Sequence, residues 1–214
     1  MDLRIEKGHC YLVLFGLKNM QLEEKVYYTP EEYLEIETAA TFKSEYYQCQ
    51  IFPMPGGTPN HNQIAGNFYA ALNFALKRQP YKVFISDMRL WIPTHQLYTY
   101  PDVMVVADKL ELAQGRKDTI TNAGAIAEVL SESTAQYDQI GKFELYRAIP
   151  TLTEYLLISQ TRIYVEQYSK TEENKWLLSD YNSENAMLKL TSVPFEIPLI
   201  ELYDKVDFES EASK

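Results

Sequence analysis

Long apolar runs are missing from this sequence, and their absence bears on where the protein resides. The only continuous apolar segment near the N-terminus, residues 10–15, is far shorter than the roughly 20 residues that a membrane-spanning helix needs. Arg4 and Lys7 precede it, but no small-residue cleavage site follows before the charged residues 23–25. We therefore expect neither a transmembrane helix nor an export signal.

Cysteine is also scarce, because the chain contains only Cys10 and Cys49. Neither has a neighbour at metal-ligand spacing, and two cysteines in 214 residues do not make a disulfide framework. This usage is typical of a reducing compartment, so the sequence predicts a cytoplasmic protein.

Basic residues are outnumbered, since 20 Lys and Arg stand against 30 Asp and Glu and give a net charge of −10. Such a balance disfavours a nucleic-acid ligand, because phosphate binding depends largely on Lys and Arg. It does not exclude one, because bound cations offset the charge of a carboxylate metal site. Lys77, Arg78 and Lys82 also form a local basic group.

The length of the chain and its 46% of hydrophobic residues predict one sizeable core. Residues 1–26 have no clear amphipathic period and are interpreted as an appendage, with Met20 as an alternative start. The main domain is expected over residues 27–208, followed by a polar tail at 209–214.

Helix and strand signals predict an α/β or α+β fold with a mixed central sheet and a C-terminal antiparallel meander. Helices are expected at residues 29–37, 60–76, 135–148 and 196–207, and strands at 45–54, 81–92, 100–107, 123–130, 154–159, 162–169 and 175–181.

Two acidic residues stand beside or within apolar strand segments. Asp102 comes directly before the apolar residues 103–106, and Glu128 lies inside the apolar segment 125–130. An unpaired carboxylate there would cost on the order of several kcal/mol, so Glu128 needs a compensating group. If the two strands are neighbours, about 4.8 Å apart, their carboxylates can share a divalent cation such as Mg²⁺ or Mn²⁺.

A simpler arrangement accounts for the same residues without a metal. Glu128 would pair with a buried Arg or Lys, and Asp102 would cap a turn. Lys142 fits either arrangement, since it shares a helix face with Asp138 and Tyr146. It could form an exposed ion pair with Asp138, or it could reach the metal site and steer a water or a phosphate.

The remaining polar candidates carry weaker signals. His61 at a helix start could contact a phosphate, but a capping or packing role is favoured, so it stays outside the predicted core site. Asp87 and Arg89 are interpreted as a cross-strand ion pair or as groups that support the site. His9 and His95 show no ligand spacing.

Six short motifs follow one another in an order typical of one protein family. They are Lys43-Ser44-Glu45-Tyr46, Pro59-Asn60-His61-Asn62, Ile85-Ser86-Asp87-Met88-Arg89, Tyr98-Thr99-Tyr100-Pro101-Asp102-Val103, Glu128-Val129-Leu130-Ser131-Glu132-Ser133-Thr134, and Tyr137-Asp138 through Lys142-Phe143. Over about residues 27–208 they resemble the Uma family of restriction endonucleases, whose core is similar to that of PD-(D/E)xK nucleases. One departure is Gln48-Cys49, where the family often has Asp-Gly, and it concerns a hairpin turn.

The resemblance implies site residues and a reaction. Asp102, after its proline, matches the first acid of the family and Glu128 the second, so both are implied metal ligands, while Glu45 matches an acid that completes the site. Nucleases of this type carry a lysine two residues after the second acid, where this chain has Leu130. The lysine role would therefore fall to Lys142 on the next helix.

Together these features predict a Mg²⁺- or Mn²⁺-dependent endonuclease that hydrolyses phosphodiester bonds of DNA, with Lys142 aligning the attacking water. The alternative is a non-catalytic nuclease-like domain that binds nucleic acid or a protein partner, which both the acidic charge and the displaced lysine allow. An interaction domain without a site is a third interpretation. The sequence also allows a homodimer, and it does not specify the target sequence.

Overall fold

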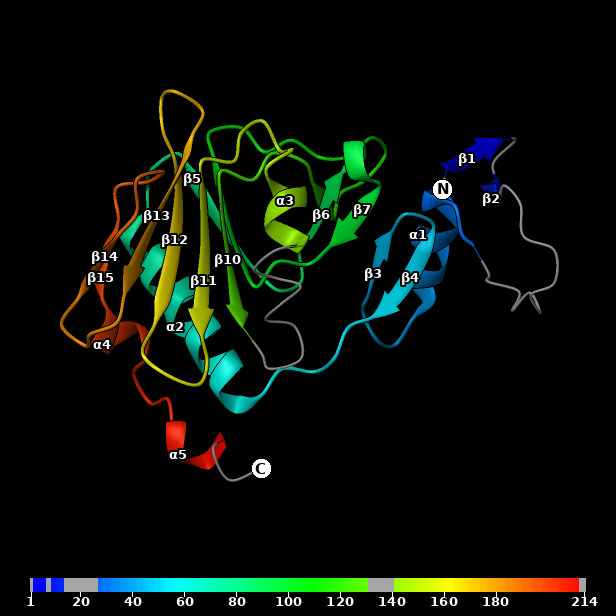
Figure 1. The fold of residues 1–214 in the computed structure, drawn as a ribbon. Coiled ribbons are helices and arrows are strands. Elements are labelled where there is room, and N and C mark those ends of the chain that lie inside the picture. Colours follow the sequence, from blue (N-terminus) through cyan, green and yellow to red (C-terminus); the bar gives the residue numbers. More distant parts are fainter. Residues whose placement is uncertain (1, 7–8, 14–26, 131–140, 212–214) are drawn as a thin grey trace. The chain divides into compact units, whose positions relative to one another are not determined.

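The computed structural model describes residues 2–6, 9–13, 27–130 and 141–211, and its chain divides into two compact units (Figure 1). The first unit comprises Met1–Pro55 and Pro93–Thr99, and the second comprises Gly56–Ile92 and Tyr100–Lys214. Within the described ranges, no helix has both the length and the apolar character needed to cross a membrane.

The first unit consists of short strands and one helix. Its elements are β1 (Asp2–Glu6), β2 (His9–Val13), α1 (Pro30–Ala39), β3 (Ser44–Tyr47), β4 (Gln50–Pro53), the 3₁₀ helix η1 (Pro93–His95) and β7 (Leu97–Thr99). β1 pairs with β2, and β3 pairs with both β4 and β7, in each case antiparallel.

Helix α1 begins with a capping box at Thr29. The Thr29 hydroxyl accepts a hydrogen bond from the Glu32 backbone N–H at 3.2 Å, and the Glu32 carboxylate accepts one from the Thr29 N–H at 2.7 Å. One turn later, the buried Tyr33 ring lies 5.3 Å from the rings of both Tyr46 and Tyr98. This aromatic cluster packs α1 against β3 and β7.

The β3–β4 hairpin forms although its turn lacks the Asp-Gly pair common in the family. Gln48 and Cys49 make the two-residue turn, and both adopt left-handed backbone conformations, with φ of 45° and 67°. Such turns favour Asn, Asp and Gly because these residues tolerate positive φ. The departure therefore changes the residues of the turn and leaves the hairpin intact.

The second unit carries the larger sheet. Its elements are α2 (Pro59–Ala75), β5 (Tyr81–Ile85), β6 (Arg89–Ile92), β8 (Val103–Ala107), β9 (Thr119–Ile120), β10 (Ala125–Leu130), α3 (Phe143–Tyr146), β11 (Glu154–Ser159), β12 (Val165–Lys170), β13 (Trp176–Tyr181), β14 (Met187–Lys189), β15 (Glu196–Pro198), α4 (Leu199–Leu202) and α5 (Phe208–Glu211). Six strands form a mixed sheet in the order β13-β12-β11-β10-β8-β5. Only β10 and β11 run parallel in it, and β11, β12 and β13 form the predicted antiparallel meander.

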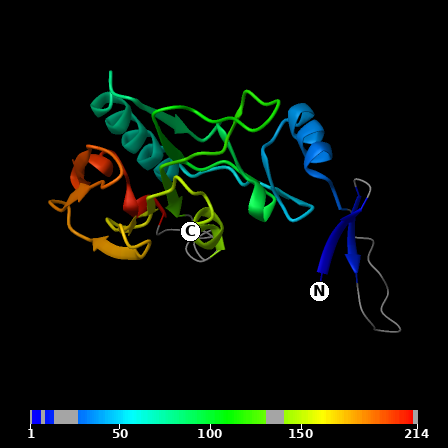
Figure 2. The same ribbon diagram turned by 90° about the horizontal axis from the view of Figure 1, so that it is seen from above.

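The two faces of this sheet are covered differently. On β10, Ala125, Ala127 and Val129 belong to the hydrophobic core that also contains the buried face of α2. Because side chains alternate along a strand, Glu128 points to the opposite face, where Tyr146 of α3 contacts it. Helices α2 and α3 thus lie on opposite sides of the sheet (Figure 2).

The predicted mixed fold is confirmed, and three element predictions are corrected. Residues 45–54 form the β3–β4 hairpin rather than one strand. Residues 81–92 do not form one strand, because Ser86 adopts a left-handed conformation with φ of 46° and separates β5 from β6. Residues 196–207 do not form one helix: the extended Pro198 ends β15, and only Leu199–Leu202 is helical. Of the helix expected at 135–148, residues 135–140 lie outside the described residues, and α3 lies within the remainder.

Candidate active site

The strand register brings the two predicted acids together. β8 and β10 are antiparallel neighbours, as the metal-site hypothesis requires, and Ala127 pairs with Val103. One step further along this register, Glu128 lies opposite Asp102. Both acids therefore stand at the same end of the β8–β10 pair.

The backbones of the two strands hold both carboxylates. Val129 donates its N–H to Asp102 Oδ2 at 2.8 Å, and Asp102 donates its own N–H to Glu128 Oε2 at 3.3 Å. The side chain of Asp102 is 16% exposed and that of Glu128 only 4%. One acid thus faces the solvent boundary while the other is buried behind it.

Glu128 has two further partners near α3. Lys142 Nζ lies 3.4 Å from Glu128 Oε1, and the Tyr146 hydroxyl donates a hydrogen bond to the same oxygen at 2.6 Å. Lys142 is buried, with 6% of its surface exposed, so it does not match the exposed ion pair that its spacing allowed. Asp138, the partner in that pair, lies outside the described residues.

An aromatic cluster anchors α3 to the sheet. The Phe143 ring stacks on Tyr155 at a centroid distance of 5.3 Å, and its centroid lies 4.4 Å from that of Tyr168 and 5.2 Å from that of Trp176. Aromatic pairs at such distances stabilise packing beyond the burial of their area. The cluster therefore fixes α3, which carries Tyr146 and begins directly after Lys142.

His61 contacts Asp102, although its sequence context favoured a role outside the site. Thr58 caps α2 and accepts a hydrogen bond from the His61 N–H at 3.1 Å, and His61 Nε2 lies 3.0 Å from Asp102 Oδ1. Burial lowers the pKa of His61, but the hydrogen bond and charge of Asp102, together with the charge of Glu128, outweigh it and raise that pKa overall. The contact thus favours a protonated imidazole beside the acids.

The contacts described for Glu45 and Arg89 are with residues other than Asp102 and Glu128. Glu45 lies on β3 in the first unit, where the Thr99 hydroxyl donates a hydrogen bond to its Oε1 at 2.5 Å. Its participation in the site remains a prediction. Arg89 donates its Nε–H to the Tyr100 hydroxyl at 2.8 Å, and its Nη1 lies 3.8 Å from Asp118.

Comparison with known proteins places the chain in a family. The model of the Uma2 family, described as "Putative restriction endonuclease", matches residues 30–199. The chain belongs to the Uma2 family. The chain is also similar to two proteins from Synechocystis sp. (strain ATCC 27184 / PCC 6803 / Kazusa). Uncharacterized protein sll1609 is 43% identical over 163 residues, which cover 76% of this chain and 92% of the relative. Uncharacterized protein slr1290 is 36% identical over 175 residues, which cover 80% of this chain and 90% of the relative.

A solved structure supports the predicted fold. A crystal structure of a putative nuclease belonging to DUF820 from Anabaena variabilis ATCC 29413 aligns with a TM-score of 0.66 and 17% sequence identity. The alignment covers 81% of this chain and 96% of that one. At this identity the likeness concerns the fold, and it confirms the nuclease-like α+β architecture of this Uma2 protein.

The donor set of this Uma2 site suits a cation that needs few protein ligands. Among the residues that the structure describes, no group of three or more His, Cys, Asp or Glu side chains could hold a metal ion. Mg²⁺, however, usually keeps several waters and takes only one or two carboxylates besides substrate phosphates. Asp102 and Glu128, on adjacent strands at one level, match that requirement.

A second buried acid in the same sheet shows a different environment. Glu154 is fully buried and accepts hydrogen bonds from the Gln167 side-chain amide at 2.5 Å and from the backbone N–H groups of Thr191 and Ser192 at 3.0 and 3.1 Å. Its charge is compensated by donors alone, and it ties a turn to the sheet. Glu128, in contrast, lies beside another acid, Asp102, and a lysine, Lys142.

Proposed function

We propose that this Uma2 protein is a metal-dependent endonuclease that hydrolyses phosphodiester bonds of DNA. The observation that carries the proposal is the convergence of Asp102, Glu128 and Lys142 at one end of the β8–β10 pair. The description of the family and the nuclease-like fold support the same reaction class.

Asp102 and Glu128 are the residues that would hold Mg²⁺ or Mn²⁺. A divalent cation bound there supplies Lewis acidity, which stabilises the negative charge that builds on the phosphate. Lys142 contributes an ammonium group that orients the attacking water or donates to the phosphate. The N–H groups of Val129 and Asp102 keep the two carboxylates aligned while the substrate binds.

A non-catalytic nuclease-like domain is the second candidate function, and one observation favours it. Lys142 and Tyr146 already compensate the charge of Glu128 without any cation. Together with the net charge of −10, this would suit a domain that has kept the nuclease core and binds a partner.

A cleavage assay separates these candidates. We expect purified protein to cut linear duplex DNA with 5 mM Mg²⁺ or Mn²⁺ and to cut nothing in EDTA, because the reaction needs the cation. Single-stranded DNA and RNA of the same length serve as comparison substrates. If none of these nucleic acids is cut with either metal, the second candidate function takes the place of the first.

His61 should support the site through Asp102. Removing a group that holds a metal ligand typically lowers metal affinity or activity by about 10- to 100-fold, so we expect a loss of that size in His61→Ala. His61→Gln should recover part of it, because its amide can still donate to Asp102. The Mg²⁺ dependence of cleavage measures the effect, with His95→Ala as control. A wild-type Mg²⁺ dependence in His61→Ala would limit His61 to packing.

A further inference from the structure

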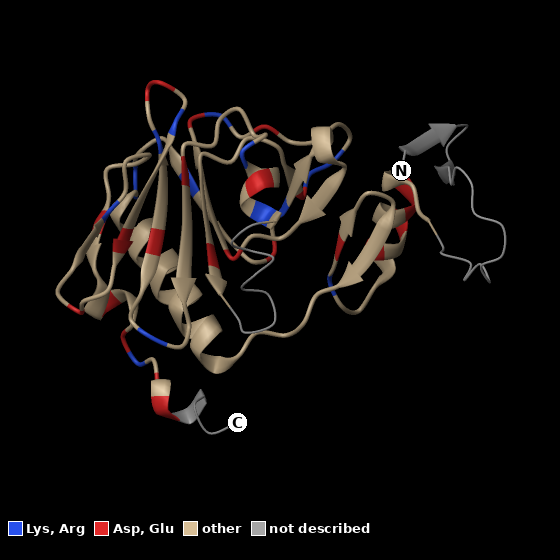
Figure 3. Ribbon diagram, viewed as in Figure 1, with Lys and Arg blue, Asp and Glu red and all other residues tan. Residues whose placement is uncertain are grey.

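Helix α2 and the segments that flank it in the sequence contain no acidic residue. Residues 56–86 contain no Asp or Glu, although the whole chain has 30 of them. Between Pro59 and Ala75, α2 also lacks Lys and Arg, so its ribbon carries neither charge colour in Figure 3. A polyanion would meet little repulsion along this helix.

One face of α2 links the candidate active site to a basic end. Asn62, Gly66, Ala70, Asn73 and Lys77 follow at helical spacing on the side away from the core, and all five are exposed or half-buried. The strip begins beside His61, which contacts Asp102, and Lys77 follows His61 by 16 residues, or about 24 Å at roughly 1.5 Å per helical residue.

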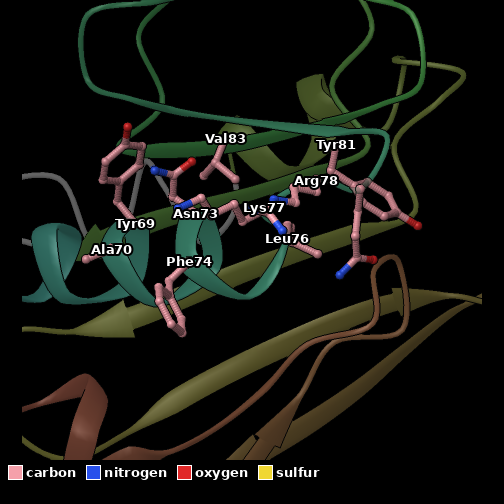
Figure 4. Close-up of a pocket in the computed structure, with 10 residues that line it drawn as sticks. Tyr69, Ala70, Asn73, Phe74, Leu76, Lys77, Arg78, Tyr81 and Val83 are labelled. Carbon is pink, nitrogen blue, oxygen red and sulfur yellow. The ribbon is translucent and has the colours of Figure 1, made fainter.

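A hollow of about 640 Å³ lies where this strip ends (Figure 4). Its lining combines aromatic, amide and basic side chains and contains no acid; Tyr69, Asn73, Lys77, Arg78 and Tyr81 contribute to it. Figure 4 shows the two tyrosines at opposite ends of the hollow, with the two basic residues between them. Lys77 and Arg78 supply cations of the kind that contact phosphates, and no acid in the lining opposes them.

Charges of both signs lie near α2. Lys82 lies between Tyr81 and Val83 of β5, which line the hollow, so its exposed side chain points to the opposite face of the strand. Asp108 approaches through a backbone hydrogen bond to Pro80, and the exposed Lys109 follows it directly. The lining of the hollow is therefore basic, in contrast to the whole chain, while Asp204 and Asp207 lie near another side of α2, where their backbones accept hydrogen bonds from Asn67 and Asn60.

We propose that this strip and hollow, here called the α2 surface, bind the phosphate backbone of the DNA on one side of the cut. The inference rests on the proposed function, because it takes the candidate active site as the position of the cut. At 3.4 Å per nucleotide along one strand, about 24 Å corresponds to roughly seven nucleotides. Lys77 and Arg78 would thus contact phosphates about seven nucleotides from the scissile bond.

Binding of labelled DNA in EDTA tests the α2 surface without cleavage. Fluorescence anisotropy with a 30-base-pair duplex should show about 10- to 100-fold weaker binding at 0.1 M salt for the Lys77→Gln/Arg78→Gln variant than for the wild type. The slope of the logarithm of the binding constant against the logarithm of the salt concentration should become shallower by about two. Each lost phosphate contact removes about 0.9 from this slope. The control Lys175→Gln/Lys189→Gln, with the same charge change on exposed residues elsewhere, should stay within about twofold of the wild type.

Substrate length provides a second test. Some duplexes end fewer than about seven nucleotides from the preferred cut, on the side that α2 covers. The wild type should bind these short duplexes as weakly as the double variant binds the 30-base-pair duplex. Unchanged affinity and salt slope in the double variant would overturn the inference, and so would an equal loss in the control. A lower molecular mass of the double variant than of the wild type, measured by light scattering, would also overturn the inference. The α2 surface would then join two copies of the chain.

The outcomes also separate this inference from the proposed function. Binding that depends on Lys77 and Arg78 without metal-dependent cleavage keeps the α2 surface and rejects the endonuclease. Cleavage with unchanged binding in the double variant keeps the endonuclease and rejects the α2 surface. Absence of both binding and cleavage rejects both.

Discussion

Cleavage by the Lys142→Ala variant should fall by about 10²- to 10⁴-fold, while its binding of divalent cations is retained. Lys142 Nζ lies 3.4 Å from Glu128 Oε1, but an ammonium group cannot coordinate a cation. Its removal should therefore affect the water or the phosphate rather than the metal. Asp102→Asn should lose both properties, because Asp102 is a proposed ligand. Single-turnover cleavage and calorimetric titration with Mn²⁺ measure the two properties separately.

The controls for this experiment address the structural role of the buried lysine. Lys142→Met keeps most of the packing volume, and Lys175→Ala removes an exposed lysine outside the site and outside the α2 surface. Removing one partner of a buried ion pair costs about 3–5 kcal/mol, so both Lys142 variants should also unfold more easily. If Lys142→Met cleaves at the wild-type rate once folded, the lysine serves only to compensate the charge of Glu128.

Sequence patterns predicted the sheet well where a strand is apolar and bounded by turn residues. The segments at 123–130 and 154–159 correspond closely to β10 and β11. The pattern failed at Ser86, because one residue in a left-handed conformation interrupts an otherwise strand-like stretch without changing its composition. It also failed at 196–207, where Glu196–Pro198 pairs with β14 and leaves only a short helix.

The predicted site residues depended on the energetic cost of a buried charge. The cost of a buried charge predicts a compensating partner for Glu128. Glu154, however, opens a similar apolar strand, and amide and hydroxyl donors compensate its charge. The cost of burial indicates that a carboxylate has a partner and does not specify which one. The neighbouring strand register supplies the missing information, because it places a second acid opposite Glu128 and none opposite Glu154.

His61 and Tyr146 were not predicted as site residues for a different reason. The contact of His61 with Asp102 joins residues 41 positions apart, and a capping role explained the same helix-start pattern. The spacing predicts that Tyr146 shares a helix face with Lys142. It does not indicate which residues contact that face. Contacts of this kind depend on how a helix end lies against a sheet, which local periodicity does not determine.

Millimolar Mg²⁺ or Mn²⁺ should raise the melting temperature of the wild-type protein, and Glu128→Gln should abolish the rise. A ligand at ten times its Kd stabilises the folded state by about 1.4 kcal/mol, which corresponds to about 3–6 °C for a chain of this size. Glu128→Gln removes a proposed ligand and the partner of Lys142, so its melting temperature without metal should also be lower. The informative quantity is therefore the metal-induced shift of each variant, measured by differential scanning calorimetry. Glu196→Gln, an exposed substitution on β15, should keep the full shift. If the wild type shows no shift and binds neither ion at millimolar concentration, Asp102 and Glu128 do not form a metal site.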